Sequence, residues 1–323
     1  MKKTGLYILF STVMFSLMEI VLKSTGTAFN PIQINWIRFS IGGIVLLPFA
    51  IQSLRIQGIM LRWSDLKLFA VTGFMCLLVS MTLFQLAIMY DQASTVAVVF
   101  SANPVFALIF SYIILHERLG RANLIAVILS VIGLLVIVNP THLNNALGLT
   151  LAISSAITFG LYSIISRYGS IKRGFNGIVM TCFTFIIGSI ELYVIILITK
   201  IKVVANGMDQ VSWLRQFSNI PLMTNVNGHF FWTLFFIGVC VTGGGFAFYF
   251  LAMERSNVST ASLVFFIKPG LAPILAALLI GDKIALTTVI GIIIIIAGSI
   301  VTFMGNQRRE TGGPMTKNIG KSV

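Results

Sequence analysis

Residues 252–283, AMERSNVSTASLVFFIKPGLAPILAALLIGDK, form an apolar helical pattern with one lysine and two prolines near its middle. The same pattern occurs earlier, at residues 87–118, AIMYDQASTVAVVFSANPVFALIFSYIILHER. Without gaps, the two stretches share residues at Ser94 and Ser259, Thr95 and Thr260, Val99 and Val264, Phe100 and Phe265, Pro104 and Pro269, and Ala107 and Ala272. An internal repeat in a very apolar chain predicts two halves related by pseudo-twofold symmetry, an architecture typical of transporters, with a binding site where the halves meet.

The composition favours a membrane protein. Of the 323 residues, 57% are hydrophobic and only 10% are charged, and the mean hydropathy is +0.98. This leaves too little polar surface to cover a soluble globule, so we expect the lipid bilayer to be the main partner. The net charge of +13 does not indicate nucleic-acid binding, because lysines and arginines lie in short links between apolar runs.

The three cysteines, Cys76, Cys182 and Cys240, each lie inside an apolar run without a CxxC motif or a nearby histidine. This arrangement predicts neither a disulfide framework nor a metal site. Lys2 and Lys3 before the first apolar run resemble the start of a signal peptide, but Glu19 and Lys23 interrupt that run. We therefore expect the first run to be a retained helix.

A membrane span needs about twenty mostly apolar residues. This rule predicts helices near residues 4–24, 31–53, 66–89, 93–115 and 121–139, and then near residues 146–166, 176–199, 229–252, 259–280 and 285–304. We therefore expect an all-α membrane protein of about ten transmembrane helices in two inverted five-helix repeats. The repeats are residues 1–140 and 141–305, followed by a basic, disordered tail at residues 306–323.

The inversion follows from the odd number of helices in each half, and the distribution of basic residues supports it. With a cytoplasmic N-terminus, the outer links hold only Lys200, Lys202, Arg215 and Lys283, whereas most other lysines and arginines lie inside. The positive-inside rule therefore predicts a cell-membrane protein with both termini cytoplasmic. The long outer link, residues 200–228, is interpreted as a short interfacial helix held by Trp213, with a lid over the outer mouth as the alternative.

The end of each half carries the same pattern, at residues 90–138 and 254–303. The pattern consists of an entry rich in alanine and serine, a mid-helix proline, an acidic-basic pair and a later glycine. These positions are Pro104, Glu117, Arg118 and Gly133, and then Pro269, Asp282, Lys283 and Gly298. Phe15-Ser16 and Phe159-Gly160 stand where the family has Trp-Gly, and Lys23 and Arg38-Phe39 lie at family-like positions. The chain thus resembles the ten-helix EamA-type members of the drug/metabolite transporter superfamily.

The resemblance implies secondary transport of small metabolites, often export of amino acids or drugs, without ATP hydrolysis. The sequence contains no GxxxxGK[ST] phosphate loop, in keeping with this. Glu19 and Lys268 depart from the family, where we expect mostly neutral side chains at these positions. The family's typical solutes are therefore not carried over to this chain.

Ionisable residues inside a span cost about 2.5–3.5 kcal/mol each on insertion scales and usually face the bundle interior. The sequence places Glu19, Lys23, Arg38, Glu191 and Lys268 inside spans. At about 1.5 Å per residue, Lys268 lies about 14 Å from the inner end of its helix, too deep to reach the interface easily. Lys268 and Asn103, its counterpart in the repeat, are therefore the first-choice substrate-binding residues.

Both residues directly precede the repeat prolines Pro104 and Pro269, which are predicted hinges because proline leaves a carbonyl one turn earlier without its helical donor. The alternative is structural: Lys268 pairs with Glu191 or Glu19 for packing alone, and Asn103 bonds to a neighbouring helix.

Glu19 and Lys23 have the i, i+4 spacing of a helical ion pair. If Lys23 reaches the interface instead, Glu19 is free for Arg38 or for substrate. Glu19 and Glu191 are also candidates for counter-ions or proton-coupling groups. Arg38 is either a solute ligand or a structural charge. Three cations against two anions leave one positive charge, which favours a carboxylate-bearing solute, such as a zwitterionic amino acid, over a quaternary amine.

Several aromatic side chains are expected around the cavity, where they can stack on a flat or apolar solute: Phe15, Phe159, Tyr162, Phe246 and Tyr249. Packing in the core or against lipid is the alternative role for them. The run Gly243, Gly244 and Gly245 is interpreted as a site of close helix approach or of hinge bending.

The sequence therefore predicts a secondary transporter that exports a small carboxylate-bearing metabolite, such as an amino acid, by alternating access. The alternatives are a multidrug exporter of organic cations and, from a different class, a membrane scaffold or sensor that moves nothing. We expect no cofactor and no enzymatic activity, since the sequence offers no nucleophile-base set and no metal-ligand spacing. Both repeats lie in one chain, so a monomer is sufficient and an oligomer remains compatible.

Overall fold

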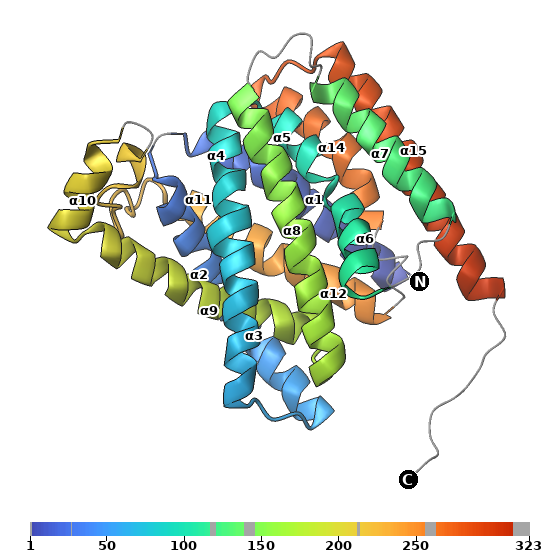
Figure 1. The fold of residues 1–323 in the computed structure, drawn as a ribbon, viewed down its shortest axis with the longest axis horizontal. Helices are drawn as coiled ribbons and strands as arrows, with labels where there is room; N and C mark the ends of the chain where they lie inside the picture. The colour runs from blue at the N-terminus through green and yellow to red at the C-terminus, as the bar shows by residue number, and fades with distance from the viewer. Residues whose placement is uncertain are drawn as a thin grey trace.

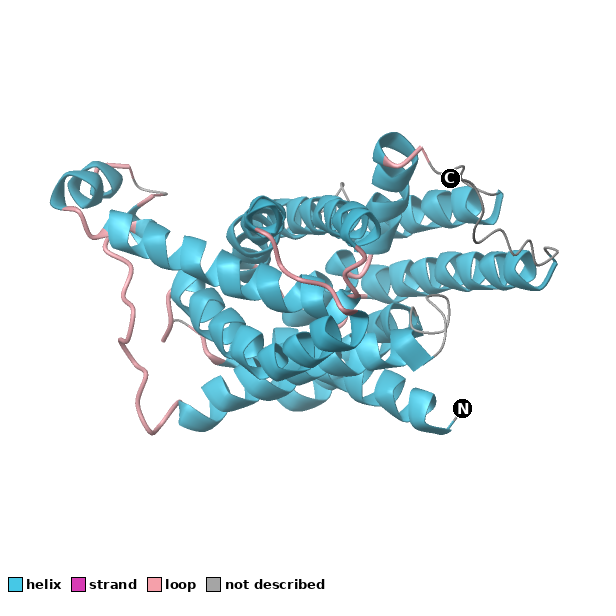
Figure 2. Ribbon diagram, turned by 90° about the horizontal axis from the view of Figure 1, so that it is seen from below, coloured by secondary structure: helices cyan, strands magenta, loops and turns pink. Residues whose placement is uncertain are grey.

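The computed structural model describes residues 2–26, 28–116, 121–138, 146–211, 214–255 and 263–312. Helices and the links between them make up this part of the chain, and it contains no strand (Figures 1 and 2). The helices of the first half are α1 (Lys2–Ser24), α2 (Pro31–Gln57), α3 (Trp63–Gly73), the π-helix η1 (Phe74–Met81), α4 (Thr82–Tyr90), α5 (Ala93–Phe100), α6 (Asn103–Ile114) and α7 (Arg121–Val138).

The second half contains α8 (Ala146–Arg173), α9 (Gly177–Thr199), α10 (Lys202–Asp209), the 3-10 helix η2 (Arg215–Phe217), α11 (Phe231–Phe235), the π-helix η3 (Phe236–Gly244), α12 (Gly245–Arg255), α14 (Leu263–Ile280) and α15 (Leu286–Gly312). In the described residues, seven helical stretches are long and apolar enough to cross a membrane. Three shorter apolar helices, Val127–Ile137, Ile267–Ile280 and Leu286–Gly298, complete the set of about ten predicted spans. The predicted all-α membrane fold is confirmed.

The two halves are inverted relative to each other, as the contacts between α2 and α9 show. These are the second long helices of their halves, and each begins after a capping asparagine. Trp36 stacks on Tyr193, the Cys182 thiol contacts the Gly43 carbonyl, and Ser53 bonds to Asn176. Residue numbers thus rise along α2 as they fall along α9, so the equivalent helices run antiparallel.

The packing around this pair repeats in the two halves. Helix α1 packs against α14 and α12, and its counterpart α8 packs against α5, α6 and α4. The third span of each half contains a π-helical segment, η1 in the first and η3 in the second. The internal repeat of the sequence is therefore a repeat of helix contacts as well.

Glycines let the third span of one half approach the second span of the other. A Cβ added to Gly73 on α3 would lie 2.8 Å from the Cα of Gly188 on α9. On the other side of the pseudo-twofold axis, a Cβ added to Gly42 on α2 would lie 2.8 Å from Thr242 and 3.5 Å from the backbone nitrogen of Gly243. Small residues at such crossings replace side-chain contacts by direct backbone packing.

The substitution Gly73→Ala is therefore expected to lower the stability of the protein by about 1–3 kcal/mol, the usual cost of overpacking. Thermal unfolding in detergent measures the change. Gly5→Ala is the matched control, since Gly5 is an exposed helical glycine with open space around it. Its alanine variant should unfold at the wild-type temperature or slightly above, because alanine has the higher helix propensity. Equal unfolding temperatures for the two variants would contradict the close crossing.

Three helices run further than the apolar pattern predicts. Helix α2 ends at Gln57 instead of residue 53, and α8 ends at Arg173 instead of residue 166. Helix α15 continues to Gly312, so the prediction that the tail is disordered was wrong for residues 306–312. The last turn of α2 carries Arg55 and that of α8 carries Lys172 and Arg173, and basic residues there interact favourably with the carbonyl end of the helix. The rest of the tail lies outside the described residues.

The long link between α9 and α11 is tied to the first half. Gln33 on α2 donates to the carbonyls of Leu222 and Thr224, at 3.2 and 2.8 Å. Ile220 is fully buried. The link contains the short helix α10, which lies at the opposite end of the molecule from the N-terminus of α1 (Figures 1 and 2). Trp213, the predicted anchor of an interfacial helix, lies outside the described residues.

Candidate functional site

Lys268 and Glu19 form an ion pair between the two halves of the bundle. The Nζ atom of Lys268 on α14 lies 2.7 Å from Oε1 of Glu19 on α1, and the two side chains are only 3% and 1% exposed. The second carboxylate oxygen, Oε2, has no hydrogen-bond partner among the described residues. The Lys268 ammonium also lies 5.4 Å from the centre of the Phe100 ring. Of the two acidic partners that the sequence suggested for Lys268, the structure selects Glu19.

Lys23 takes no part in this pair. Its ammonium donates to the backbone carbonyls of Ile88, at 2.7 Å, and Asp91, at the end of α4. A cation placed there satisfies carbonyls that have no helical donor and interacts favourably with the helix dipole. The i, i+4 pair of Glu19 with Lys23 is therefore not formed, and Glu19 points to Lys268 instead.

Arg38 on α2 is a fully buried cation, 1% exposed, without an acidic partner within ion-pair distance in the described part of the chain. Its Nε atom donates to Asn35 Oδ1 at 2.9 Å. Its Nη1 and Nη2 atoms face the sulfurs of Met18 and Met81, at 3.5 and 3.4 Å. Since thioether sulfur is a weak acceptor, the positive charge of Arg38 has no strong acceptor on its two terminal nitrogens within the described residues.

We call Glu19, Arg38 and Lys268 the ionic centre. Its three charges come from α1, α2 and α14, and they leave a balance of one positive charge, since one anion faces two cations. Met18, which contacts Arg38, directly precedes Glu19 on α1. Among the described residues, Arg38 thus has no carboxylate within ion-pair distance, and Oε2 of Glu19 has no hydrogen-bond partner.

Asn103 has a local role at a break in the fourth span. Helix α5 ends at Phe100 and α6 begins at Asn103, separated by Ser101 and Ala102. Pro104 has no N–H to donate to the Phe100 carbonyl one turn earlier, and the side-chain amide of Asn103 donates to that carbonyl instead, at 2.7 Å. In the second half α14 is continuous through Pro269. The two predicted hinge prolines thus lie in different local structures.

The candidate aromatic residues lie in two groups. Phe15 packs edge-on against Phe246, with ring centres 5.0 Å apart, and Tyr249 packs against the same small core cluster. Phe159 packs against Phe100 and against Tyr162, at 5.1 and 5.3 Å. Phe100 therefore joins the second group to Lys268, and Phe15 and Phe159 occupy equivalent places in the two halves.

Glu191 lies apart from the ionic centre. It belongs to α9 near the crossing with α3, where a Cβ added to Gly73 would lie 3.1 Å from its Oε2 atom. That oxygen is buried and has no hydrogen-bond partner among the described residues. The structure does not bring Glu191 to Lys268, so it is not the counter-ion of that lysine in this conformation.

The glycine run lies where η3 meets α12. A Cβ added to Gly245 would lie 2.8 Å from the Phe15 ring, and one added to Gly243 would lie 2.8 Å from Val45. Gly244 ends η3 and faces the Val239 carbonyl. The run therefore lets α1 and α2 approach this span closely.

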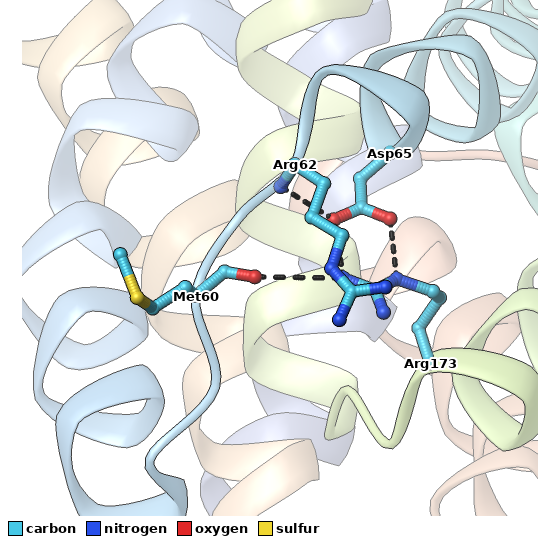
Figure 3. A network of polar contacts seen from close by, with 4 residues as sticks. All are labelled: Met60, Arg62, Asp65 and Arg173. Atoms are coloured by element: carbon cyan, nitrogen blue, oxygen red, sulfur yellow. Dashed lines mark hydrogen bonds and ion pairs between the residues drawn. The ribbon is translucent and has the colours of Figure 1, made fainter.

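An ion pair at the end of the bundle that carries the N-terminus of α1 was missed from the sequence. Asp65, in the first turn of α3, accepts two hydrogen bonds from the guanidinium of Arg173, the last residue of α8, one of them at 2.8 Å (Figure 3). The same carboxylate accepts from the backbone N–H of Arg62 at 2.8 Å. The pair joins the two halves, and nothing in the local sequence around either residue identifies its partner.

Different contacts join the halves at the other end of the bundle. The rings of Phe29 and Phe230 meet edge to face, 5.0 Å apart. Asp282, in the link before α15, accepts from the backbone N–H and the hydroxyl of Ser94, at 3.1 and 3.2 Å. Burial raises the pKa of Asp91 in the link before α5, with Lys23 opposing this effect and Asp282 adding to it.

Comparisons with known proteins agree with this architecture. The model of the EamA-like transporter family matches residues 2–139 and 146–304. An uncharacterized transporter of Clostridium kluyveri is 32% identical over 320 residues, covering 95% of each chain. An S-adenosylmethionine uptake transporter of Rickettsia prowazekii is 26% identical over 167 residues, covering 52% of this chain and 55% of that protein. One solved crystal structure, 16% identical, superposes with a TM-score of 0.62 and covers 95% of this chain and 99% of the other.

Proposed function

Because the chain belongs to the EamA-like transporter family, we propose that it moves a small carboxylate-bearing metabolite across the cell membrane by alternating access. Membership of the family makes the protein a multi-pass membrane transporter, and not an enzyme. The proposal adds the chemical class of the solute, the site that binds it and the direction of transport, which we propose to be export.

The buried positive charge of Arg38, which no carboxylate of the described residues contacts, carries the proposal. A guanidinium buried in a low-dielectric bundle is costly unless charged or strongly polar acceptors surround it. A carboxylate is the acceptor that matches its two terminal nitrogens. Lys268 already forms an ion pair with Glu19. Arg38 is therefore the first-choice ligand for the solute carboxylate, and Lys268 is the second choice.

The free oxygen of Glu19 is the natural acceptor for an ammonium group on the same solute. A zwitterionic amino acid then pairs both of its charges. The relative from Rickettsia prowazekii is named for S-adenosylmethionine, which itself carries an amino-acid carboxylate and ammonium. That name supports a carboxylate-bearing solute, although it describes uptake. The assay below therefore measures both directions.

Alternating access requires each end of the bundle to open in turn. With both termini cytoplasmic, the Asp65–Arg173 pair closes the inner end, and the Phe29–Phe230 and Asp282–Ser94 contacts close the outer end. Each of these contacts joins one half to the other. Rocking of one half against the other therefore separates the contacts at one end while keeping those at the other.

Asp65→Asn is expected to weaken the inner closure, because asparagine loses the charge of the carboxylate that accepts from the partly exposed Arg173. We expect a lower unfolding temperature in detergent and unequal flux in the two directions. The charge-reversed double variant Asp65→Arg with Arg173→Asp should recover part of both. Asp209→Asn, at an exposed acid on α10, is the control. If the double variant is no closer to the wild type than Asp65→Asn in unfolding temperature and flux, the two residues do not form a pairwise contact.

The test of the proposed function is flux of labelled amino acids and of a model organic cation in proteoliposomes, measured in both directions with and without a pH gradient. Amino-acid flux above that of protein-free liposomes supports the proposal, and its dependence on the gradient measures proton coupling. Flux of the cation alone would replace the proposal by the drug-export alternative. Flux of neither, across a wide solute screen, would favour the scaffold or sensor.

A further inference from the structure

The two methionines that face Arg38 occupy the side of the guanidinium that a carboxylate needs. Nη1 faces the sulfur of Met18 on α1, and Nη2 faces the sulfur of Met81, the last residue of η1. Both side chains are buried. Because the two terminal nitrogens present parallel N–H groups, this is the side at which a carboxylate binds in a bidentate manner.

The other side of Arg38 is fixed. Nε donates to Asn35 Oδ1, and the amide nitrogen of Asn35 donates to the Met81 carbonyl at 2.8 Å. The ring of Phe39 lies 4.2 Å from the guanidinium carbon. Asn35 and Phe39 therefore hold the orientation of the guanidinium, and the backbone of Met81 is held together with it. The methionine side chains are the contacts of Arg38 that can change without moving these supports.

Sulfur and oxygen differ in how well they accept from a charged donor. A thioether is a weak acceptor on a flexible, unbranched side chain, whereas a carboxylate forms short, charge-assisted hydrogen bonds. We propose that Met18 and Met81 are specificity-determining residues, which cover Arg38 in the solute-free protein and are displaced by the two oxygens of the solute carboxylate. This inference rests on the proposed function and deepens it.

The assignment explains why methionine suits these two positions. A stronger acceptor, such as an amide, would compete with the solute for Arg38, and a leucine would leave the N–H groups without any acceptor. The acceptor strength of a thioether sulfur lies between that of an amide and that of a leucine side chain. The sulfurs therefore cover the cation but are displaced by a planar oxyanion. A solute with a carboxamide in place of the carboxylate gains little from displacing them.

Substitutions with opposite expected signs test the proposal. The probe is the labelled amino acid that the wild type carries fastest, together with its carboxamide analogue. Met18→Leu and Met81→Leu keep the side-chain volume and remove the acceptor, so KM for the amino acid should fall by about five- to tenfold, the effect of about one hydrogen bond. Met81→Gln adds a stronger acceptor and should raise KM by a similar factor. The maximal rate should stay within about twofold in all three variants.

Met180→Leu is the matched control, since Met180 on α9 is equally buried and no hydrogen bond from Arg38 reaches it. A purely structural role for Met18 and Met81 would lower the maximal rate or the unfolding temperature and leave KM unchanged, which would overturn the proposal. KM changes of the same sign for leucine and glutamine would overturn it as well. Met81→Gln keeps an acceptor for Arg38, so it tests the proposal even if a leucine variant does not fold.

The two proposals fail in different ways. Absence of amino-acid flux in the wild type overturns the proposed function, and with it the displacement of the methionines. Wild-type amino-acid flux with an unchanged ratio of amino acid to carboxamide transport in Met81→Gln overturns only the displacement.

Discussion

Lys268→Met is expected to abolish solute flux and to destabilise the protein by about 3–5 kcal/mol, whereas the double variant Lys268→Met with Glu19→Gln regains stability but not flux. The single substitution leaves Glu19 buried at 1% exposure without its cation, and an uncompensated buried charge is the costly outcome of breaking such a pair. The double variant removes both charges together. Thermal unfolding in detergent and flux in proteoliposomes measure the two effects separately.

The comparison separates the two interpretations of Lys268. Double-variant protein that is stable and inactive supports a role of the pair in transport, whereas a stable and fully active double variant would reduce the pair to packing. Lys202→Met, at an exposed lysine on α10, controls for the loss of a positive charge. If Lys268→Met unfolds at the wild-type temperature, the ion pair does not contribute to the fold as the geometry requires.

Arg38→Gln is expected to lower carboxylate flux by about ten- to hundredfold and, unlike Lys268→Met, to change the stability of the protein little. The expected loss follows from the charge-assisted pair that we propose between Arg38 and the solute carboxylate, since such a pair is worth about 1.5–3 kcal/mol. Stability is expected to change little because Arg38 has no acidic partner in the described residues to be left unpaired. Glutamine also retains a donor for Asn35.

Arg38→Lys should recover only part of the flux, since an ammonium keeps the charge but loses the planar, two-pronged geometry. Arg55→Gln is the matched control, at an exposed arginine on the same helix. A variant of Arg38 that transports normally but unfolds easily would make this arginine a structural charge, the alternative that the sequence also allowed. Flux and unfolding measured on the same preparation decide between the two roles.

Most of the architecture could be predicted because it depends on patterns that are read along the chain. The length of the apolar runs gives the spans, and the repeat around Pro104 and Pro269 gives the two halves. The burial of Lys268 was also predictable, since a lysine so deep in a span has no route to water. These features need no knowledge of which helix lies next to which.

The pairing of the charges was less predictable. Glu19 and Glu191 were equally available to Lys268 by sequence, and only the packing of α1 against α14 decides between them. The pair of Asp65 with Arg173 and the sulfur contacts of Arg38 are likewise properties of helices brought together from distant parts of the chain. Sequence spacing predicts contacts within a helix, such as the i, i+4 pair of Glu19 with Lys23. Even this pair is not formed, because Lys23 donates to backbone carbonyls at the end of α4 instead.

The repeat also concealed a difference between the halves. Prolines at equivalent positions predict equivalent hinges, yet the first half breaks before Pro104 and the second continues through Pro269. A proline removes one hydrogen bond, and a helix can either stop or tolerate that loss, depending on its neighbours. In the first half, the side chain of Asn103 donates to the Phe100 carbonyl, which lacks its helical donor.

The contacts that join the halves differ in chemistry between the two ends of the bundle, and this makes the ends sensitive to different properties of their surroundings. Dissolved ions screen the partly exposed pair of Asp65 with Arg173, whereas cooling weakens the apolar contact of Phe29 with Phe230. Ionic strength therefore acts on the ion pair at one end of the bundle, and temperature acts on the aromatic contact at the other end.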